Sequence, residues 1–239
     1  MDKIKRLQNW INTAQSIVFF GGAGVSTESG IPDFRSADGL YHQKYDYPPE
    51  IILSHTFFIS QTEEFYRFYR DKMINLDAKP NSSHTALTKL EKIGKLKGII
   101  TQNIDGLHQM AGSQNVLELH GNIHRNYCME CHKNYAVDSI LHSTGIPYCT
   151  CGGIIKPDVV LYEEALDENV LRNAVALITS ADILIVGGTS LAVYPAAGLL
   201  DYYQKDKLVL INRNATPRDS FANLLIQDSI GTVFERMNF

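Results

Sequence analysis

The sequence predicts an α/β fold with a doubly wound parallel sheet, and three observations support this prediction. Short apolar runs alternate with amphipathic helical patterns along most of the chain. A glycine-rich stretch directly follows the first apolar run, where a strand of such a sheet turns toward a helix. Two segments, residues 36–80 and 123–156, break the alternation, so we interpret them as insertions.

The apolar runs have the continuous hydrophobicity of strands that are buried on both faces, as parallel strands in α/β proteins are. The predicted strands cover residues 16–20, 97–101, 115–119, 181–188 and 207–212. Because helical patterns lie between or around most of these runs, we expect helices on both faces of the sheet.

Amphipathic patterns predict the helices that pack on this sheet. They cover residues 4–14, 82–94, 167–180 and 214–225. Gly94 is a typical residue to end the second of them. In the last, Thr216 is expected to cap the helix and Pro217 to lie in its first turn.

The two insertions differ in composition. Residues 63–73 form an aromatic-rich helical pattern, whereas residues 123–156 hold all the cysteines. We therefore assign residues 1–35, 81–122 and 157–239 to the sheet domain, 36–80 to a helical insertion and 123–156 to a cysteine ribbon. If the insertions pack at the carboxyl ends of the strands, the groove between the parts is the expected ligand site.

Composition argues against several classes of function. The chain of 239 residues has a net charge of −4, which is opposite in sign to that of dedicated nucleic-acid binders. Apolar runs stay well short of the roughly 20 residues of a membrane helix. The N-terminus lacks the apolar stretch of a signal peptide. We expect a cytoplasmic protein that binds neither membranes nor nucleic acid.

The cysteines form one local cluster. Cys128 and Cys131 make a Cys-x-x-Cys knuckle, and Cys149 and Cys151 make a tighter Cys-x-Cys pair. In a chain without a secretion signal, this spacing favours a closed structural zinc site over disulfides. Four free thiols or a redox pair are the alternative. Because the second pair is tight, other candidates for the fourth ligand are His124, His132 and His142.

The stretch "GGAGVSTESGIPDFR", residues 21–35, follows the first predicted strand. Its closely spaced glycines suit a turn that approaches a pyrophosphate. Thr27 stands where the dinucleotide fingerprint has its third glycine, which disfavours a redox dehydrogenase. The acid, aromatic ring and guanidinium of Asp33, Phe34 and Arg35 indicate that the nucleotide is acted on and not only held.

Polar residues also follow the later strands. They are Gln102, Asn103, Asp105, His120, Gly188, Thr189, Ser190 and Asn212. Since the carboxyl ends of parallel strands meet at one edge of a sheet, these residues are expected to line one nucleotide-sized groove. A histidine there can act as a general base near neutral pH. Spacing alone does not choose His120 over His108 or His124.

Five motifs occur together in one order: "GAGVSTESGIPDFR", "TQNID", the "HG" of "LELHG", the cysteine ribbon and "GTSL". With this set, nearly the whole chain resembles the sirtuins of bacterial type, which are NAD-dependent protein lysine deacylases. The resemblance implies a Rossmann-like NAD-binding domain with a small zinc-ribbon and helical insertion module. It also implies NAD as co-substrate, one structural Zn²⁺ and acylated lysines, in extended peptides, as substrates.

The resemblance further implies a role for each motif. His120 would be the general base that deprotonates a ribose hydroxyl, and Asn103 would order the reacting ribose beside it. The implied zinc ligands are Cys128, Cys131, Cys149 and Cys151. The implied cofactor site comprises Ala23 and Thr27 at the phosphates, Asp33, Phe34 and Arg35 toward the departing nicotinamide, Gln102, Asn103 and His120 at the ribose, Ile104 and Asp105 at the carboxamide, and Gly188, Thr189, Ser190, Asn212 and Ile230 toward the adenosine.

Two departures from the family pattern bear on the substrate. Glu163 stands in the peptide-binding stretch where relatives usually have glycine. Relatives that prefer succinyl-lysine carry a Tyr-x-x-Arg pair on the aromatic helix, and here Tyr66 is followed three residues on by Tyr69. An arginine would pair with the acyl carboxylate. We therefore expect acetyl or other uncharged acyl groups.

Two rival functions are open at this point. A mono-ADP-ribosyltransferase on the same scaffold would use the same NAD pocket, and the histidine in "LELHG" favours deacylation over it. A non-catalytic zinc-ribbon binding module is disfavoured by the acidic balance and by the polar strand ends. We expect a monomer.

Overall fold

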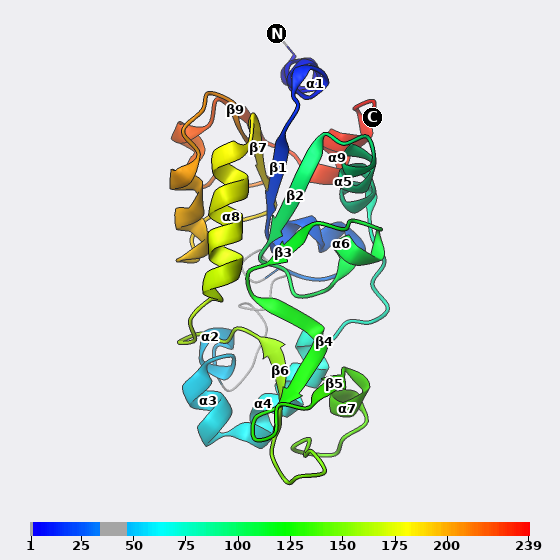
Figure 1. Cartoon of the computed structure of the whole chain (residues 1–239), viewed down its shortest axis with the longest axis vertical. Helices are drawn as coiled ribbons and strands as arrows, with labels where there is room; N and C mark the ends of the chain where they lie inside the picture. The colour runs from blue at the N-terminus through cyan, green and yellow to red at the C-terminus, as the bar shows by residue number, and fades with distance from the viewer. Residues whose placement is uncertain (1, 34–46) are drawn as a thin grey trace.

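The computed structural model describes residues 2–33 and 47–239. The chain forms a larger part around one sheet and a smaller part below it, which we call the small module (Figure 1). Both termini lie at the end of the larger part that points away from the small module (Figure 1). Among the described residues, no helix is both long and apolar enough to cross a membrane.

The large sheet is parallel throughout and has the strand order β3-β2-β1-β7-β8-β9. Its strands are β1 (Ile17–Gly21), β2 (Leu96–Thr101), β3 (Val116–Glu118), β7 (Ile183–Gly187), β8 (Leu208–Ile211) and β9 (Leu224–Ile226). Counted within this sheet, the order is 3-2-1-4-5-6, which is the doubly wound Rossmann arrangement. The predicted fold class and all the predicted strands are confirmed.

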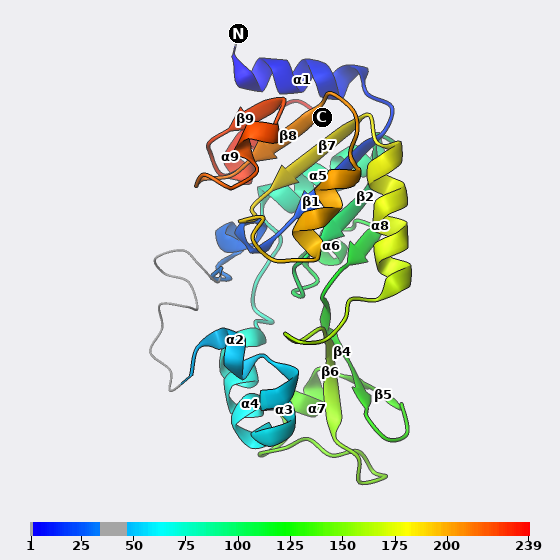
Figure 2. The same cartoon turned by 90° about the vertical axis from the view of Figure 1, so that its left-hand side faces the viewer.

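Helices cover both faces of this sheet, and the side chains of each strand alternate between the two cores. Ile17 and Phe19 of β1 pack beneath α1 (Lys3–Thr13), α5 (Ser82–Lys92) and α9 (Ile230–Glu235). Val18 and Phe20 face α8 (Glu168–Ser180) and the 3-10 helix Ala196–Tyr202. Figure 1 shows α8 on one side of β1 and β2, with α5 and α9 on the other, and Figure 2 shows α1 across the end of the sheet that points away from the small module. The central strands β1, β7 and β8 are therefore buried on both faces, as the apolar runs predict.

The small module combines a three-stranded antiparallel sheet with short helices. The strands are ordered β5-β4-β6, with bounds β4 (Gly121–Cys128), β5 (Asn134–Ala136) and β6 (Ile155–Val159). The helices are α2 (Pro49–Ile52), α3 (His55–Ser60), α4 (Thr62–Phe68), which continues into a π-helical turn Tyr69–Met73, and α7 (Asp138–Leu141). An aromatic core joins helices to sheet, and the Tyr66 hydroxyl donates to the Ile155 carbonyl at 2.5 Å.

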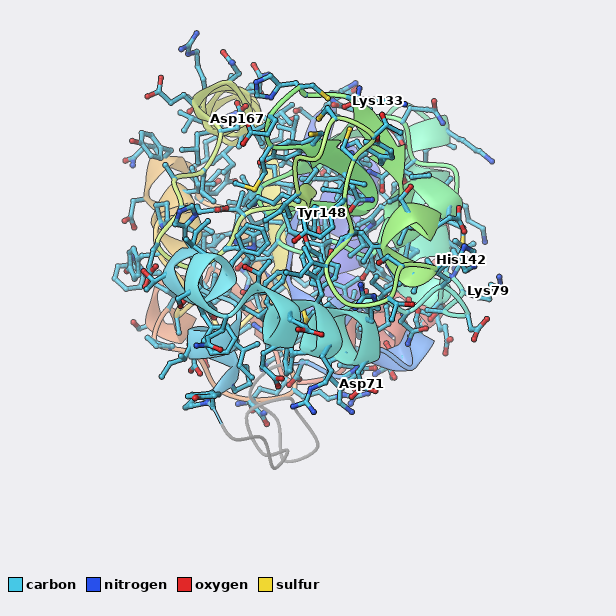
Figure 3. All side chains as sticks on the ribbon, turned by 90° about the horizontal axis from the view of Figure 1, so that it is seen from below. Asp71, Lys79, Lys133, His142, Tyr148 and Asp167 are labelled. Carbon is cyan, nitrogen blue, oxygen red and sulfur yellow. The ribbon has the colours of Figure 1, made fainter. Side chains whose placement is uncertain are left out.

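The outer end of the small module is exposed to solvent. Viewed from this end, Asp71, Lys133 and His142 lie on the surface, and Tyr148 is near the middle of the face (Figure 3). The division of the chain into three segments stays a prediction. The small sheet itself runs from residue 121 to residue 159 and so extends slightly beyond the predicted ribbon.

One helix prediction is wrong. Residues 214–225 form a short 3-10 helix, Asp219–Phe221, followed by the edge strand β9. Asn223 explains the change, because its side-chain oxygen accepts from the Leu208 amide at 2.8 Å and its own amide donates to the Leu208 carbonyl at 2.9 Å. This contact with the strand β8 fixes the backbone before Leu224 and overrides helix propensity. The remaining short elements are the 3-10 helices Ala23–Val25 and Thr27–Ser29, and α6 (Leu107–Met110).

Candidate active site

A cavity of about 840 Å³ lies at the carboxyl ends of the large sheet and extends to the small module. Its position beside β1 and β7 is the point where the strand order reverses, which is where doubly wound sheets bind nucleotides. The predicted site residues that line it are Ala23, Thr27, Asp33, Gln102, Asn103, Ile104, Asp105, His120, Gly188, Thr189, Ser190, Asn212 and Ile230. Phe34 and Arg35 lie outside the described residues.

The glycine-rich turn after β1 packs directly on the turn after β7. The Gly24 amide donates to the Gly188 carbonyl at 2.7 Å. A Cβ on Gly24 would lie 2.7 Å from the Gly188 Cα, and one on Gly188 would lie 2.4 Å from the Val25 amide nitrogen. Gly188 also has a φ of +61°. These glycines are thus required by the contact between two turns, as well as by any phosphate.

Thr27 explains how the turn ends without a third glycine. Its hydroxyl donates to the Gly24 carbonyl at 3.1 Å, and Thr27 begins the second 3-10 helix. Glu28 then reaches across to α9, where its carboxylate accepts from the Ser229 hydroxyl at 2.9 Å and the Gly231 amide at 3.1 Å. The turn is therefore fixed to the far side of the cavity.

Ser26, in the turn after β1, connects this turn to the polar residues that follow β2. Its hydroxyl donates to the Asp105 carboxylate at 2.6 Å and accepts from the Asn103 side chain at 3.1 Å. The Leu107 amide donates to the other Asp105 oxygen at 2.9 Å. Burial nevertheless raises the pKa of Asp105, against these hydrogen bonds. Sequence reasoning did not single out Ser26, although it lies inside the quoted glycine-rich motif.

Of the three candidate histidines, His120 is the one that lines the cavity. It follows β3, and its Nδ1 lies 3.0 Å from the Gln102 carbonyl, so we assign the proton of the neutral ring to Nδ1. Burial lowers the pKa of His120, and the bond to Gln102 partly opposes this. The ring is therefore neutral at pH 7, with Nε2 able to accept a proton. His108 packs on His84 in the core, and His124 lies near the Asp105 carbonyl at the surface.

A second polar network lies at the ends of β7 and β8. The Gln102 side chain donates to the Thr189 hydroxyl at 3.0 Å, and the Thr189 amide donates to the Asn212 side-chain oxygen at 3.0 Å. The Asn212 side-chain nitrogen is buried and has no partner among the described residues. An orphaned buried donor in a cavity is expected to meet a ligand. These residues fit the ribose and adenine half of a dinucleotide.

The cysteines form a separate site in the small module. All four sulfur atoms lie within 4.8 Å of one another. Cys128 and Cys151 Sγ are 3.4 Å apart, and Cys131 and Cys149 Sγ are 3.6 Å apart. A tetrahedral Zn²⁺ with bonds of about 2.3 Å needs similar spacings. Both cysteines of the tight pair join the cluster, so the histidine alternatives are unnecessary. The Tyr135 hydroxyl also donates a hydrogen bond to the Cys149 Sγ at 2.9 Å.

The cavity also contains residues that sequence reasoning did not assign to a site. The small module contributes residues 159–164, and the turns after β8 and β9 contribute Arg213 and Asp228. Asp228 could have been found only by recognising β9 as a strand, whereas Arg213 directly follows the predicted strand at 207–212. The family resemblance places Glu163 in a peptide-binding stretch, but nothing in the spacing of residues 159–164 indicates a turn against a distant helix.

The model of the Sir2 family matches residues 22–195 of the chain. The chain is 61% identical to an NAD-dependent protein deacetylase of Clostridium acetobutylicum, over 98% of both chains, and 60% identical to one of Clostridium perfringens, over 99% of this chain and 98% of the relative. A solved structure of Sir2 with a deacetylated p53 peptide and 3'-O-acetyl-ADP-ribose has a TM-score of 0.90 at 41% identity, covering 98% of this chain and 96% of the other. Sir2 bound to an acetylated peptide has a TM-score of 0.88 at 40% identity, with the same coverage.

Proposed function

Because the chain belongs to the Sir2 family, we infer that it is an NAD-dependent protein deacetylase. It transfers the acyl group of an acyl-lysine to ADP-ribose and releases nicotinamide. The observation that supports this most directly is the cavity at the strand switch point, in which a neutral, half-buried histidine faces the same space as the polar strand ends. The family's relatives and solved neighbours agree with this reading along the whole chain.

Different residues of the cavity contact different parts of the NAD molecule. Ala23 and Thr27, in the turn after β1, lie along the phosphates. The Asp105 carboxylate and Ile104 hold the nicotinamide carboxamide, and Gln102 and Asn103 order the nicotinamide ribose. The adenosine half is held by Gly188, Thr189, Ser190, Asn212 and Ile230. The buried, unpartnered Asn212 nitrogen supports this orientation. Asp33 lines the same cavity, and the roles of Phe34 and Arg35 beside the nicotinamide stay predictions.

The chemistry follows from where charge develops. Loss of nicotinamide builds positive charge on the ribose, so the acyl oxygen must be held against that carbon and water kept out. Asn103 is 8% exposed and bonded to Ser26, which gives it a fixed orientation for this step. His120 then removes a proton from a ribose hydroxyl, which attacks the acyl carbon. Its Nδ1 bond to the Gln102 carbonyl orients the ring for this transfer.

The cysteine cluster has a structural role. Four thiolates close the coordination sphere of a zinc ion, so no position is open for a catalytic water. The zinc, when bound, ties the loop that contains Cys149 and Cys151 to the knuckle that begins at the end of β4. The cluster is separate from the cavity, whose lining includes none of the four cysteines.

The aromatic helix supports a preference for uncharged acyl groups. Arg67 pairs with Glu64 at the surface. Arg70 donates to the Ile140 carbonyl at 2.8 Å and to the Ser143 hydroxyl at 2.6 Å, so both its faces are used by the small module. Neither arginine lines the cavity, whereas Tyr69 does. An acyl carboxylate in the cavity would therefore meet neither Arg67 nor Arg70, so this helix does not supply the arginine partner of succinyl-lysine.

The test is mass spectrometry of the protein with NAD and a mixture of acetyl-, butyryl- and succinyl-lysine peptides. We expect acyl-ADP-ribose and free lysine in equal amounts, with succinyl-lysine the poorest substrate, and no product without NAD. Nicotinamide release with ADP-ribose attached to protein would instead establish the transferase. The cytoplasmic location, the lack of nucleic-acid binding and the monomeric state stay predictions from the sequence.

A further inference from the structure

Residues 160–164, which we call the rim segment, follow β6 and line the cavity. The Val160 amide donates to the His120 carbonyl at 3.0 Å, so the rim segment begins in contact with the backbone of the proposed general base. A Cβ on the next residue, Gly121, would lie 1.9 Å from the Asp158 carbonyl oxygen, which shows how closely the two strands meet here. An acyl-lysine that reaches His120 therefore passes the rim segment.

The rim segment is attached to the start of α3, far from it in sequence. The Tyr162 amide donates to the Leu53 carbonyl at 3.0 Å, and the His55 amide donates to the Tyr162 carbonyl at 2.9 Å. The Glu163 carboxylate accepts from the Thr56 amide at 2.8 Å. The first amides of a helix have no partner within it. Glu163 thus supplies from the rim segment an acceptor that α3 needs.

The backbone of Glu163 shows that this contact is built at a conformational disadvantage. Glu163 has a φ of +75°, in the left-handed region that glycine adopts freely and that other residues avoid. Its side chain is exposed, so packing does not hold it there. The hydrogen bond from the Thr56 amide to the Glu163 carboxylate is the interaction that offsets the cost of this backbone conformation. A glutamate at this position is therefore more than a solvated surface group.

The neighbouring Glu164 anchors the base of the rim segment independently. Its carboxylate accepts from the Leu161 amide at 2.9 Å and pairs with Lys156 at 3.1 Å, and Lys156 is 5% exposed. The other Glu164 oxygen lies 2.9 Å from Nδ1 of His55. Because these contacts do not involve Glu163, removal of the Glu163 side chain is expected to loosen the outer rim and to leave the fold intact.

We propose that Glu163 is a positioning residue for the acyl-lysine peptide: its carboxylate fastens the rim segment to α3 and so holds the wall along which the peptide enters. This inference rests on the proposed deacetylase function. We expect Glu163 to affect the binding of the peptide and not that of NAD. The rim segment belongs to the small module, whereas the proposed NAD contacts come from the ends of the large sheet.

The test compares steady-state kinetics of the full chain with those of Glu163→Gly, Glu163→Gln and Ala165→Gly. Glu163→Gly keeps the backbone conformation accessible and removes the carboxylate. If the rim segment is then correctly placed for only part of the time, KM for an acetyl-lysine peptide rises about threefold to tenfold, while kcat and KM for NAD stay within about twofold. Glu163→Gln keeps an acceptor oxygen and should restore most of the peptide affinity.

Ala165→Gly is the matched control, because it adds backbone freedom at an exposed neighbour whose methyl side chain can form no hydrogen bond to α3. We expect it to behave as the unmodified protein. An unchanged peptide KM in Glu163→Gly, or an equal rise in Ala165→Gly, would overturn the proposal. Hydrogen exchange of the Thr56 amide gives a second readout that needs no activity. Faster exchange in Glu163→Gly, but not in Glu163→Gln, supports the attachment even if the unmodified protein deacetylates no peptide.

Discussion

The sheet domain and the small module are stabilised by different means. Two largely aliphatic cores cover the large sheet, and most of their side chains come from strands and helices that hydrophobic patterns in the sequence predict. The small module relies on an aromatic core, a cluster of thiols and bonds between distant segments, such as that between Tyr66 and Ile155. The sheet domain is therefore indicated by local hydrophobic patterns, whereas the small module relies on contacts between distant segments around a site built for a metal.

Loss of zinc should have the largest effect, because the cysteine cluster lies in the small module alone. Structural zinc sites contribute about 10 kcal/mol or more to folding in small domains. We expect chelation, or Cys128→Ala, to unfold the small module and abolish deacetylation, while the large sheet and NAD binding persist. Zinc release, limited proteolysis and NAD affinity measure the three effects. Thr144→Ala, at an exposed ribbon position, is the control. Full activity of the metal-free protein would show that the module folds without zinc.

His120→Ala should lower the deacetylation rate without destabilising either region, since His120 lies where the two regions meet. Loss of a general base lowers the rate by about two to four orders of magnitude. Because the ring makes one bond to a carbonyl and is part of neither core, we expect an unchanged urea midpoint and unchanged NAD affinity. The exposed His142→Ala serves as control. A variant that keeps its deacetylation rate would exclude His120 as the base.

Acid should weaken the sheet domain through two buried histidines, His84 and His108. Burial lowers the pKa of His84 to about 4 and that of His108 to about 3, and the neighbouring His84 lowers the latter further. The folded state then binds fewer protons than the unfolded state, so stability is complete above pH 6.5 and falls as pH decreases. Between pH 7 and pH 5 the free energy of unfolding therefore falls by about 2 kcal/mol for each of the two buried imidazoles. Urea unfolding at the two pH values measures this, and His108→Leu should lessen the difference. Equal stability of the unmodified protein at both would contradict the assignment.

Tyr135→Phe should have the smallest effect and tests how finely the metal site is built. The Tyr135 hydroxyl donates to the Cys149 sulfur at 2.9 Å. Partners of metal ligands affect metal affinity by about tenfold or more. We expect faster zinc transfer to a chelator in this variant, with deacetylation near normal while zinc is bound. Transfer at the unmodified rate would mean that the hydroxyl does not support the ligand.

Much of the sheet domain can be predicted from sequence, and the site only in part. The runs around Ile17, Ile99 and Val186 identify strands because burial on both faces demands continuous hydrophobicity. The strand β9 is missed, since three residues at a sheet edge leave too short a pattern to outweigh the helical signal at Thr216 and Pro217. Its pairing with β8 is a tertiary effect.

The site residues show the same division. Asn103 and Asp105 follow a recognisable strand, whereas His120 is chosen by family resemblance and then by its place in the cavity. Ser26 gains its meaning from a bond to Asp105, which lies far along the chain. The role of Glu163 depends on a backbone angle and on a helix that begins more than a hundred residues earlier. Such pairings carry no local signal.

Gly24 and Gly188 fill each other's missing side-chain space, and this has a consequence for how the protein can vary. A methyl group on either residue meets the backbone of the opposite turn, so one substitution already separates the two turns. The second substitution then has little left to disrupt, and the combined loss should be well below the sum of the two single losses. In a mutational library the pair therefore behaves as one unit, with strong epistasis between two turns that are far apart in the sequence.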